Sequence, residues 1–408
     1  MSNPDRPAAT GGAAPDIDAG LLDRMIEIRR HLHRHPELSN REAGTQAYLR
    51  QMLAEEGIEA VRDVAGYGLA VDVVGTGRPS NRKLVIRADI DALPIEEESG
   101  VEFASENPGV MHACGHDAHT AMGFAVAAHL HRSRESFGGT VRLIFQPAEE
   151  DEPSGGKRVV EEGLLDDVDA AICVHVDPYT ASGKVAVGAG PYTLACDTFD
   201  VLVTGSAAHA AKPYEGVDAL TAACSMVGEL QKIVSRETDP YDPLVISVTS
   251  INGGNAYNVT AGKVTFKGTI RSGSDATRER AGRRLREIVE GIAASHGATV
   301  QVDIHQGEPG VVNDAEMTEL ILAGATAAIG ADNVLTMPGW SIADDFAYYS
   351  EKRPSVYFRL GIRNEEVGSV YPLHHARFRV DEAALKAGVA TMVSAATMFL
   401  STQRDDPA

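Results

Sequence analysis

Leu84–Pro94 reads Leu-Val-Ile-Arg-Ala-Asp-Ile-Asp-Ala-Leu-Pro. The apolar run Leu84–Ile90 is typical of a buried strand, and it leads into two carboxylates, Asp89 and Asp91. In an α/β sheet, the carboxyl ends of the strands are where functional groups gather. This stretch therefore predicts an α/β fold with polar side chains at one edge of a sheet.

The segments around this strand continue the pattern. Residues 18–33 and 120–132 have the apolar spacing of helices, and residues 69–74, 140–145 and 170–174 are short apolar runs typical of strands. Strands that alternate with helices and end in polar residues predict a parallel or mixed sheet covered by helices.

The pattern changes near residue 197. Six elements are expected in the order βαββαβ, which is typical of a small ferredoxin-like domain: 199–203, 217–235, 244–251, 264–270, 276–296 and 299–304. We therefore predict a discontinuous catalytic domain of residues 18–196 and 310–402, interrupted by an inserted domain at 197–309. Residues 1–17 and 403–408 are expected to be disordered tails.

Composition narrows the class of protein. A chain of 408 residues exceeds what one hydrophobic core usually holds, and a formal net charge of −21 argues against nucleic acid or a membrane surface as a partner. We find no apolar run long enough to cross a bilayer and no apolar core of a signal peptide. Four cysteines are too few for a disulfide framework, so a cytoplasmic location is the expectation.

Met111–His119 places a thiol, three imidazoles and a carboxylate within nine residues. Thiolate and imidazole suit zinc and, to a lesser degree, cobalt, nickel or manganese. Gly115 lets the backbone turn sharply, so that Cys114 and His116 can face one ion. The alternative is a histidine-rich surface turn that leads into a helix.

Further candidate ligands come from other parts of the chain. Glu150 and His175 each follow an apolar strand, and His374 lies in a late loop. Together with Cys114 and His116, they exceed the needs of one tetrahedral zinc and fit two ions that share a bridging ligand. A thiolate has lone pairs for both ions, which makes Cys114 the candidate bridge.

Glu149 and Glu150 are adjacent carboxylates that emerge directly from an apolar strand. One carboxylate can hold a metal while its neighbour stays unligated and takes a proton from water. We assign Glu150 to the metal and Glu149 to the role of general base.

Four other polar residues are assigned around this site. Asp91, counted among the catalytic groups, and Asp117 are interpreted either as groups that orient ligand imidazoles or as helix caps. His112 and His119 are interpreted as bystanders that serve packing or the polarity of a helix start.

Taken together, these stretches resemble the M20 family of metallo-aminoacylases and peptidases, specifically its amidohydrolase branch. That branch includes hippurate hydrolases, N-acyl-amino-acid deacylases and auxin-conjugate hydrolases. The resemblance runs from about residue 21 to residue 390 and rests on Leu32–Leu38, Arg87–Ile95, Met111–Thr120, Gly139–Glu150, Gly205–Pro213, Tyr257–Val259, Gly268–Arg271 and Leu373–His374. It implies that the five candidate ligands match the di-metal ligands of the family and that Glu149 matches its general base.

The resemblance also implies roles for the inserted domain, as a lid and as the interface of a homodimer or of a tetramer built from it. His209 matches a lid histidine that reaches the active site of the partner subunit and stabilises the oxyanion there. Asn258 and Arg271 match residues that hold the substrate carboxylate. The alternative for Arg271 is a surface arginine on a strand.

Two stretches depart from the pattern of the branch. Asn258-Val259-Thr260-Ala261 stands where Asn-Val-Ile-Pro is common, and the lost proline loosens the turn that carries Asn258. Ala343-Asp344-Asp345-Phe346 replaces Ser-Glu-Asp-Phe, so the carboxylate of Asp344 reaches one methylene less far.

The expected function is hydrolysis of the amide bond of an N-acyl or N-aroyl amino acid, or of a similar small amide. The expected cofactors are two divalent ions per subunit, manganese or zinc in the first place and cobalt or nickel in the second. One alternative keeps the di-metal site but cleaves another C–N bond, in an aryl amine or an amidine. Others are a thiol enzyme with Cys114 as nucleophile beside His116, and a non-catalytic small-molecule-binding relative.

Overall fold

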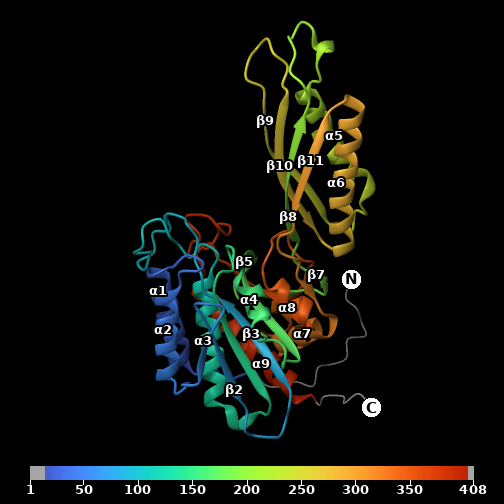
Figure 1. Cartoon of the computed structure of the whole chain (residues 1–408). Helices are drawn as coiled ribbons and strands as arrows, with labels where there is room; N and C mark the ends of the chain where they lie inside the picture. Colours follow the sequence, from blue (N-terminus) through green and yellow to red (C-terminus); the bar gives the residue numbers. More distant parts are fainter. Residues whose placement is uncertain (1–13, 403–408) are drawn as a thin grey trace, which may run out of the picture. The chain divides into compact units, whose positions relative to one another are not determined.

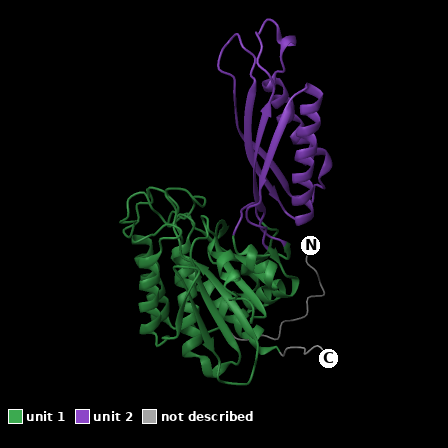
Figure 2. Cartoon of the chain, viewed as in Figure 1, with its two compact units in different colours: residues 1–190, 312–339, 345–408 green, residues 191–311, 340–344 purple. Residues whose placement is uncertain are grey.

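The computed structural model describes residues 14–402 of the chain. The chain divides into two compact units (Figure 2), namely Met1–Gly190 with Val312–Gly339 and Asp345–Ala408, and Pro191–Val311 with Trp340–Asp344. Residues 191–196, 310–311 and 340–344, which the sequence assigned to the larger domain, lie in the second unit. Ile17, expected in the N-terminal tail, is buried in the core, while the rest of the expected tails at 1–13 and 403–408 lies outside the described residues.

A mixed sheet of eight strands forms the centre of the first unit, in the order β1-β2-β4-β3-β5-β14-β6-β13. The strands are β1 (Val61–Val64), β2 (Gly68–Val74), β3 (Lys83–Asp89), β4 (Thr140–Gln146), β5 (Ala170–Ala181), β6 (Val185–Val187), β13 (Val334–Thr336) and β14 (Ser355–Arg363). The central strands β4, β3, β5 and β14 are parallel, whereas β1 with β2, β2 with β4, and β14 with β6 are antiparallel. The mixed α/β sheet predicted from the sequence is confirmed.

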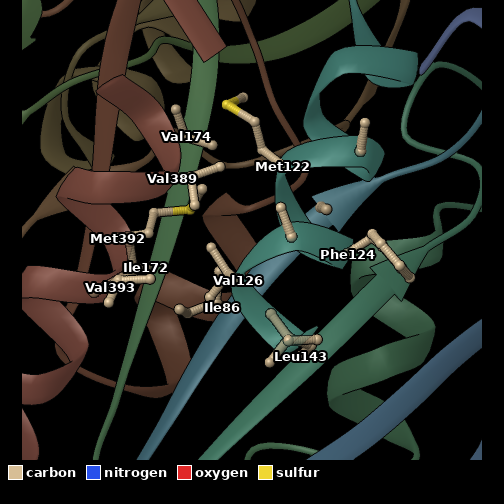
Figure 3. Close-up of a cluster of buried hydrophobic side chains, with 14 of the residues drawn as sticks. Ile86, Met122, Phe124, Val126, Leu143, Ile172, Val174, Val389, Met392 and Val393 are labelled. Carbon is tan, nitrogen blue, oxygen red and sulfur yellow. The ribbon is translucent and has the colours of Figure 1, made fainter. Parts of the chain in front are cut away.

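The helices of the first unit (Figure 1) are α1 (Ala19–Arg34), α2 (Ala43–Glu55), α3 (His116–Arg132), α4 (Gly155–Glu161), α7 (Ala315–Ile329), α8 (Ala347–Lys352) and α9 (Leu385–Ser401). The core forms where α3 and α9 pack against the central strands. Figure 3 shows Val126 of α3 beside Ile86 of the sheet, and Met392 and Val393 of α9 beside Ile172. Burying such side chains is the main stabilising term of the fold.

The segment Glu382–Ser401 is apolar and long enough to cross a bilayer by composition alone, but 72% of it is buried inside the fold. Leu385, Val389 and Met392 belong to the hydrophobic core of the first unit. The segment therefore serves as a core helix.

The second unit contains an antiparallel sheet in the order β11-β8-β10-β9, so that β9 and β11 are its outer strands. Along the chain its elements are β8 (Ala195–Thr204), α5 (Ala219–Glu237), β9 (Leu244–Gly253), β10 (Lys263–Ser272), α6 (Asp275–His296) and β11 (Thr299–His305). Two further short strands lie where the chain passes from one unit to the other: β7 (Gly190–Pro191) spans the boundary, and β12 (Val312–Asn313) belongs to the first unit. The second unit has its own core, which includes Phe199, Met226, Phe266 and Leu285.

Candidate active site

Neighbouring parallel strands bring their functional residues to one level of the sheet. Asp89 of β3 is paired with Gln146 of β4, and Arg87 of β3 is paired with Cys173 of β5. His175 follows Cys173 by two residues and therefore lies level with Asp89. Strands β3 and β4 end at this level, where the chemistry was expected, whereas β5 continues to Ala181, so that His175 lies within a strand and not after it as the sequence suggested.

Helix α3 begins inside the Cys/His stretch, at His116, and not at Thr120 as the apolar spacing suggested. Gly115 precedes it with a φ of 87°, a conformation that is costly for any residue with a Cβ atom. A Cβ at this position would lie 2.5 Å from Cγ2 of Val176. Glycine is therefore needed for the chain to turn between Cys114 and His116, both of which are buried.

The five predicted ligands lie together. The ligand atoms of Cys114, His116 and His175 are within 4.8 Å of one another, and so are those of Cys114, Glu150 and His374. Sγ of Cys114 is 3.4 Å from Nε2 of His175, and Nε2 of His374 is 3.2 Å from Oε1 of Glu150. Cys114 belongs to both groups, which is the position required of a bridging ligand.

Glu149 borders this cluster. Its Oε2 lies 3.9 Å from Nε2 of His116, the same distance as Oε1 of Glu150. Ala148 precedes the two glutamates with a φ of 49°, and the N–H of Glu150 donates to Oδ2 of Asp91 at 3.0 Å. The turn after β4 thus carries both carboxylates toward the same imidazole.

The histidine tautomers leave lone pairs directed at the cluster. Nδ1 of His116 lies 3.0 Å from Oδ1 of Asp91, and Nδ1 of His175 lies 2.8 Å from the carbonyl oxygen of Val176. Because both partners are acceptors, each Nδ1 carries a proton, which leaves Nε2 as the atom of each ring that can bind a cation. Nε2 of His116 is buried and has no hydrogen-bond partner among the described residues. A buried array of sulfur, nitrogen and carboxylate lone pairs fits a divalent cation.

Asp91 and Asp117 differ in their contacts. Asp91 is fully buried and holds His116 as described, while its Oδ2 also accepts from Oγ of Ser39 at 2.7 Å. The orienting role predicted for Asp117 is not supported, because its Oδ2 instead pairs with Nε of Arg29 at 3.0 Å and Nδ1 of His33 at 2.9 Å. Asp117 lies in the first turn of α3, where a carboxylate interacts favourably with the helix dipole.

The remaining predicted residues belong to the second unit. His209 and Asn258 are exposed and lie side by side, since His209 forms a β-bridge with Val259 and the N–H of Ala210 donates to the carbonyl of Asn258 at 2.9 Å. Arg271 lies eight residues after the start of β10, opposite Cys196 at the start of β8. His209 and Asn258 therefore share one end of this sheet, and Arg271 lies at the other.

Comparison with known proteins places the chain in a family. Residues 85–398 match the model of peptidase family M20/M25/M40. The chain belongs to this family. Among its curated relatives, thermostable carboxypeptidase 2 of Saccharolobus solfataricus is 38% identical, over 90% of this chain and 93% of the relative. N-acetyl-L-cysteine deacetylase of Bacillus subtilis is also 38% identical, over 90% of this chain and 85% of the relative.

A solved structure agrees with this assignment. The YXEP protein of Bacillus subtilis, described as a dinuclear metal binding peptidase from the M20 family, is 33% identical. It matches with a TM-score of 0.83 over 94% of this chain and 100% of its own. As a member of the M20/M25/M40 family, the present protein is an enzyme, an amidohydrolase that binds divalent metal ions.

The electrostatic environment of this M20 site disfavours the deprotonated forms of Cys114 and His116, which are the forms that bind a metal ion. Burial and the carboxylate of Glu150 raise the pKa of the Cys114 thiol well above its usual range. Burial works against a charge on His116, but Asp89 and Asp91 outweigh it and raise the pKa of this imidazole to about 10. Both groups therefore hold protons until a cation replaces them, so metal binding releases protons.

Sequence reasoning missed two residues beside the ligands, Asp89 and His119. Nε2 of His119 accepts the N–H of Val176 at 3.0 Å, so its Nδ1 carries the proton and donates to Oδ1 of Asp89 at 2.7 Å. The carbonyl oxygen of the same residue, Val176, accepts from Nδ1 of the His175 ring, which makes His119 a support for that ligand rather than a bystander. The spacing of His119, three residues after His116 on one helix, was the available signal.

Proposed function

We propose that the protein hydrolyses the amide bond between an acyl or aroyl group and the nitrogen of an amino acid. The observation that carries this proposal is a five-ligand cluster with an additional carboxylate, Glu149, at its border. The name N-acetyl-L-cysteine deacetylase, borne by one relative, supports an N-acyl amino acid as the substrate class.

In this proposal Cys114, His116, Glu150, His175 and His374 hold two divalent ions, manganese or zinc in the first place and cobalt or nickel in the second. When bound, such ions lower the pKa of water and polarise a carbonyl group. The mixed set of sulfur, nitrogen and oxygen ligands does not select one of these metals sharply.

Glu149 acts as the general base. It accepts a proton from the attacking water as the new C–O bond forms, and it delivers that proton to the nitrogen as the C–N bond breaks. The products are a carboxylic acid and a free amino group, and Glu149 returns to its ionised form. Asp91 serves this step indirectly, because it orients the His116 ring and binds the N–H of Glu150.

The inserted domain, residues 197–309, acts as lid and dimer interface for the catalytic domain at 18–196 and 310–402. Eight residues of extended strand span about 26 Å, so Asn258 and Arg271 of one subunit are too far apart to hold the same small substrate. We therefore assign His209, as oxyanion donor, and Asn258 to the site of the partner subunit. Arg271 pairs with the substrate carboxylate in its own subunit.

A homodimer, or a tetramer built from it, follows from this assignment. Val245 and Ile251 are 46% and 44% exposed on β9, an outer strand of the inserted domain, and they support this edge as the interface. We place the enzyme in the cytoplasm, with a small amide as its substrate.

Metal removal tests the proposal. The chelated protein is reconstituted separately with Mn²⁺, Zn²⁺, Co²⁺ and Ni²⁺, and amine release is measured on a panel of N-acetyl, N-benzoyl and longer N-acyl amino acids. Activity is expected to disappear on chelation and to return with at least one metal. Full activity of the metal-free protein, abolished by thiol alkylation, would instead establish Cys114 as a nucleophile. If the enzyme turned over only aryl amines or amidines, the proposed substrate class of N-acyl amino acids would be wrong.

A further inference from the structure

We propose that Glu42 is a positioning residue, which holds the turn that carries Glu149 and Glu150 in its working conformation. The inference rests on the proposed function, because it concerns the supply of the general base and one ligand to the metal cluster.

The side chain of Glu42 does not cap the helix that it precedes. Glu42 directly precedes α2 but makes no side-chain hydrogen bond to that helix. Glu37 does so in its place, accepting the N–H groups of Gly44 at 3.1 Å and Thr45 at 2.7 Å. Oε1 of Glu42 instead accepts two other N–H groups, that of Asn40 in the preceding loop at 3.0 Å and that of Ala148 in the turn after β4 at 2.8 Å.

The turn needs this support because of the conformation of Ala148. Its φ of 49° is unfavourable for a residue with a Cβ atom, by roughly 1–2 kcal/mol. Apart from Glu42, the turn is held by the N–H of Gly155, which donates to the carbonyl of Ala148 at 2.8 Å, and by Asp91, which accepts the N–H of Glu150. Two buried carboxylates, Glu42 and Asp91, thus fix the two ends of a three-residue turn.

Glu42 is a costly residue to bury for stability alone. It is 0% exposed, its Oε2 has no hydrogen-bond partner among residues 14–402, and the like charge of Asp91 is nearby. Burial, with a contribution from Asp91, raises the pKa of Glu42 to about 7. A smaller or apolar residue would avoid this cost but would leave the N–H of Ala148 without its acceptor.

Four variants test the role: Glu42→Ala, Glu42→Gln, Ala148→Gly and the double variant Glu42→Ala/Ala148→Gly. For each we would measure kcat, KM, thermal stability and the dissociation constant for Co²⁺ from visible absorption. Glu37→Ala is the matched control, because it removes a neighbouring carboxylate that accepts two N–H groups of α2. It is expected to lower stability while kcat and Co²⁺ affinity stay close to wild type.

Glu42→Ala is expected to lower kcat by about 10–100-fold and to weaken Co²⁺ binding by about tenfold, with a smaller change in KM. Glu42→Gln retains an acceptor oxygen and should stay within a few-fold of wild type. Glycine adopts a positive φ without strain, so the double variant should recover most of the lost kcat and Co²⁺ affinity, whereas Ala148→Gly alone should change little.

The role is overturned if Glu42→Ala behaves like Glu37→Ala, with lower stability but unchanged kcat and Co²⁺ affinity. It is also overturned if Ala148→Gly restores nothing in the double variant, since the conformation of the turn would then not be the cause. If the wild-type protein cleaved no amide at all, the proposed function would fail. The Co²⁺ affinities would still decide whether Glu42 positions Glu150.

Discussion

The metal cluster of the first unit and the predicted substrate residues of the second unit are built in opposite ways. Cys114, His116 and His175 are 7%, 1% and 2% exposed, and buried partners hold the two imidazoles. His209 and Asn258 are exposed on loops at one end of a sheet. One half of the proposed active site is therefore fixed by packing within a chain, while the other half, in the proposed mechanism, acts on the site of a partner subunit.

The largest effect should come from the packed half. Glu149→Ala is expected to lower kcat by about 10³–10⁴-fold, because it removes the group that receives the proton, while both metals stay bound. Turnover by steady-state kinetics and metal content by elemental analysis would check this outcome. Asp151→Ala, which changes an exposed carboxylate two residues away, should be close to wild type. Activity of Glu149→Ala near that of the control would remove the proposed mechanism.

Mixing two inactive variants should show whether the exposed half and the packed half of one active site come from different subunits. His209→Ala alone should lose about 10²–10³-fold in kcat, the usual cost of a missing oxyanion donor. When His209→Ala and Glu149→Ala subunits are unfolded and refolded together, half of the dimers are mixed and one of their two sites is intact. Activity should then return to about a quarter of wild type, as dimer symmetry dictates. Mixed samples that stay inactive would place His209 in its own active site.

The burial of Glu42 in the packed half should also make the free energy of unfolding of the protein depend on pH. The pKa of Glu42 is raised from 4.5 to about 7 in the folded state, so folding favours the neutral form of this carboxyl group. The free energy of unfolding is therefore highest below pH 4.5, where Glu42 is neutral in both states, and it falls as the pH rises toward 7. Between pH 5 and pH 8, wild type should therefore lose on the order of 3 kcal/mol relative to Glu42→Gln. Urea unfolding at both pH values measures this difference. Glu290→Gln, at an exposed site of α6, should run parallel to wild type.

The smallest effect concerns the support of a ligand rather than the ligand itself. His119→Ala should weaken Co²⁺ binding by about 10–100-fold, because the Val176 peptide loses an acceptor and His175 loses its fixed orientation. His119→Gln places an amide near the position of Nε2 and should recover part of this affinity. His129→Ala, near the end of the same helix, is the control. Equal Co²⁺ affinity in all three variants would return His119 to a bystander.

Much of the packed half could be predicted from the sequence, because its signals are local. Apolar runs that end in polar residues located the strands, and the mixed sheet followed from their alternation with helices. The spacing of Cys114 and His116 around Gly115 indicated the metal cluster before any distance was known. What brought Glu150, His175 and His374 together was the parallel order of β4, β3 and β5 and the return of a late loop.

Other features could not be predicted, because they depend on contacts between distant segments. Asp117 looked like a partner of ligand imidazoles, but Arg29 and His33, more than 80 residues earlier, bind it instead. Helix α3 begins at His116 because Gly115 reverses the chain there, whereas the apolar spacing becomes helical only later. The support at Glu42 has no signal in the sequence and that at His119 only its spacing from His116, since each acts through a backbone N–H group of another element.

The place of β14 in the first sheet affects how the protein matures during synthesis. This strand, Ser355–Arg363, lies between β5 and β6, although the whole second unit is made before it. Residues 191–311 are contiguous and have their own core, so they can fold on the ribosome while the first sheet still lacks a central strand. The set of metal ligands is complete only later, when His374 has left the ribosome. The nascent enzyme thus acquires its second unit first and its catalytic capacity last.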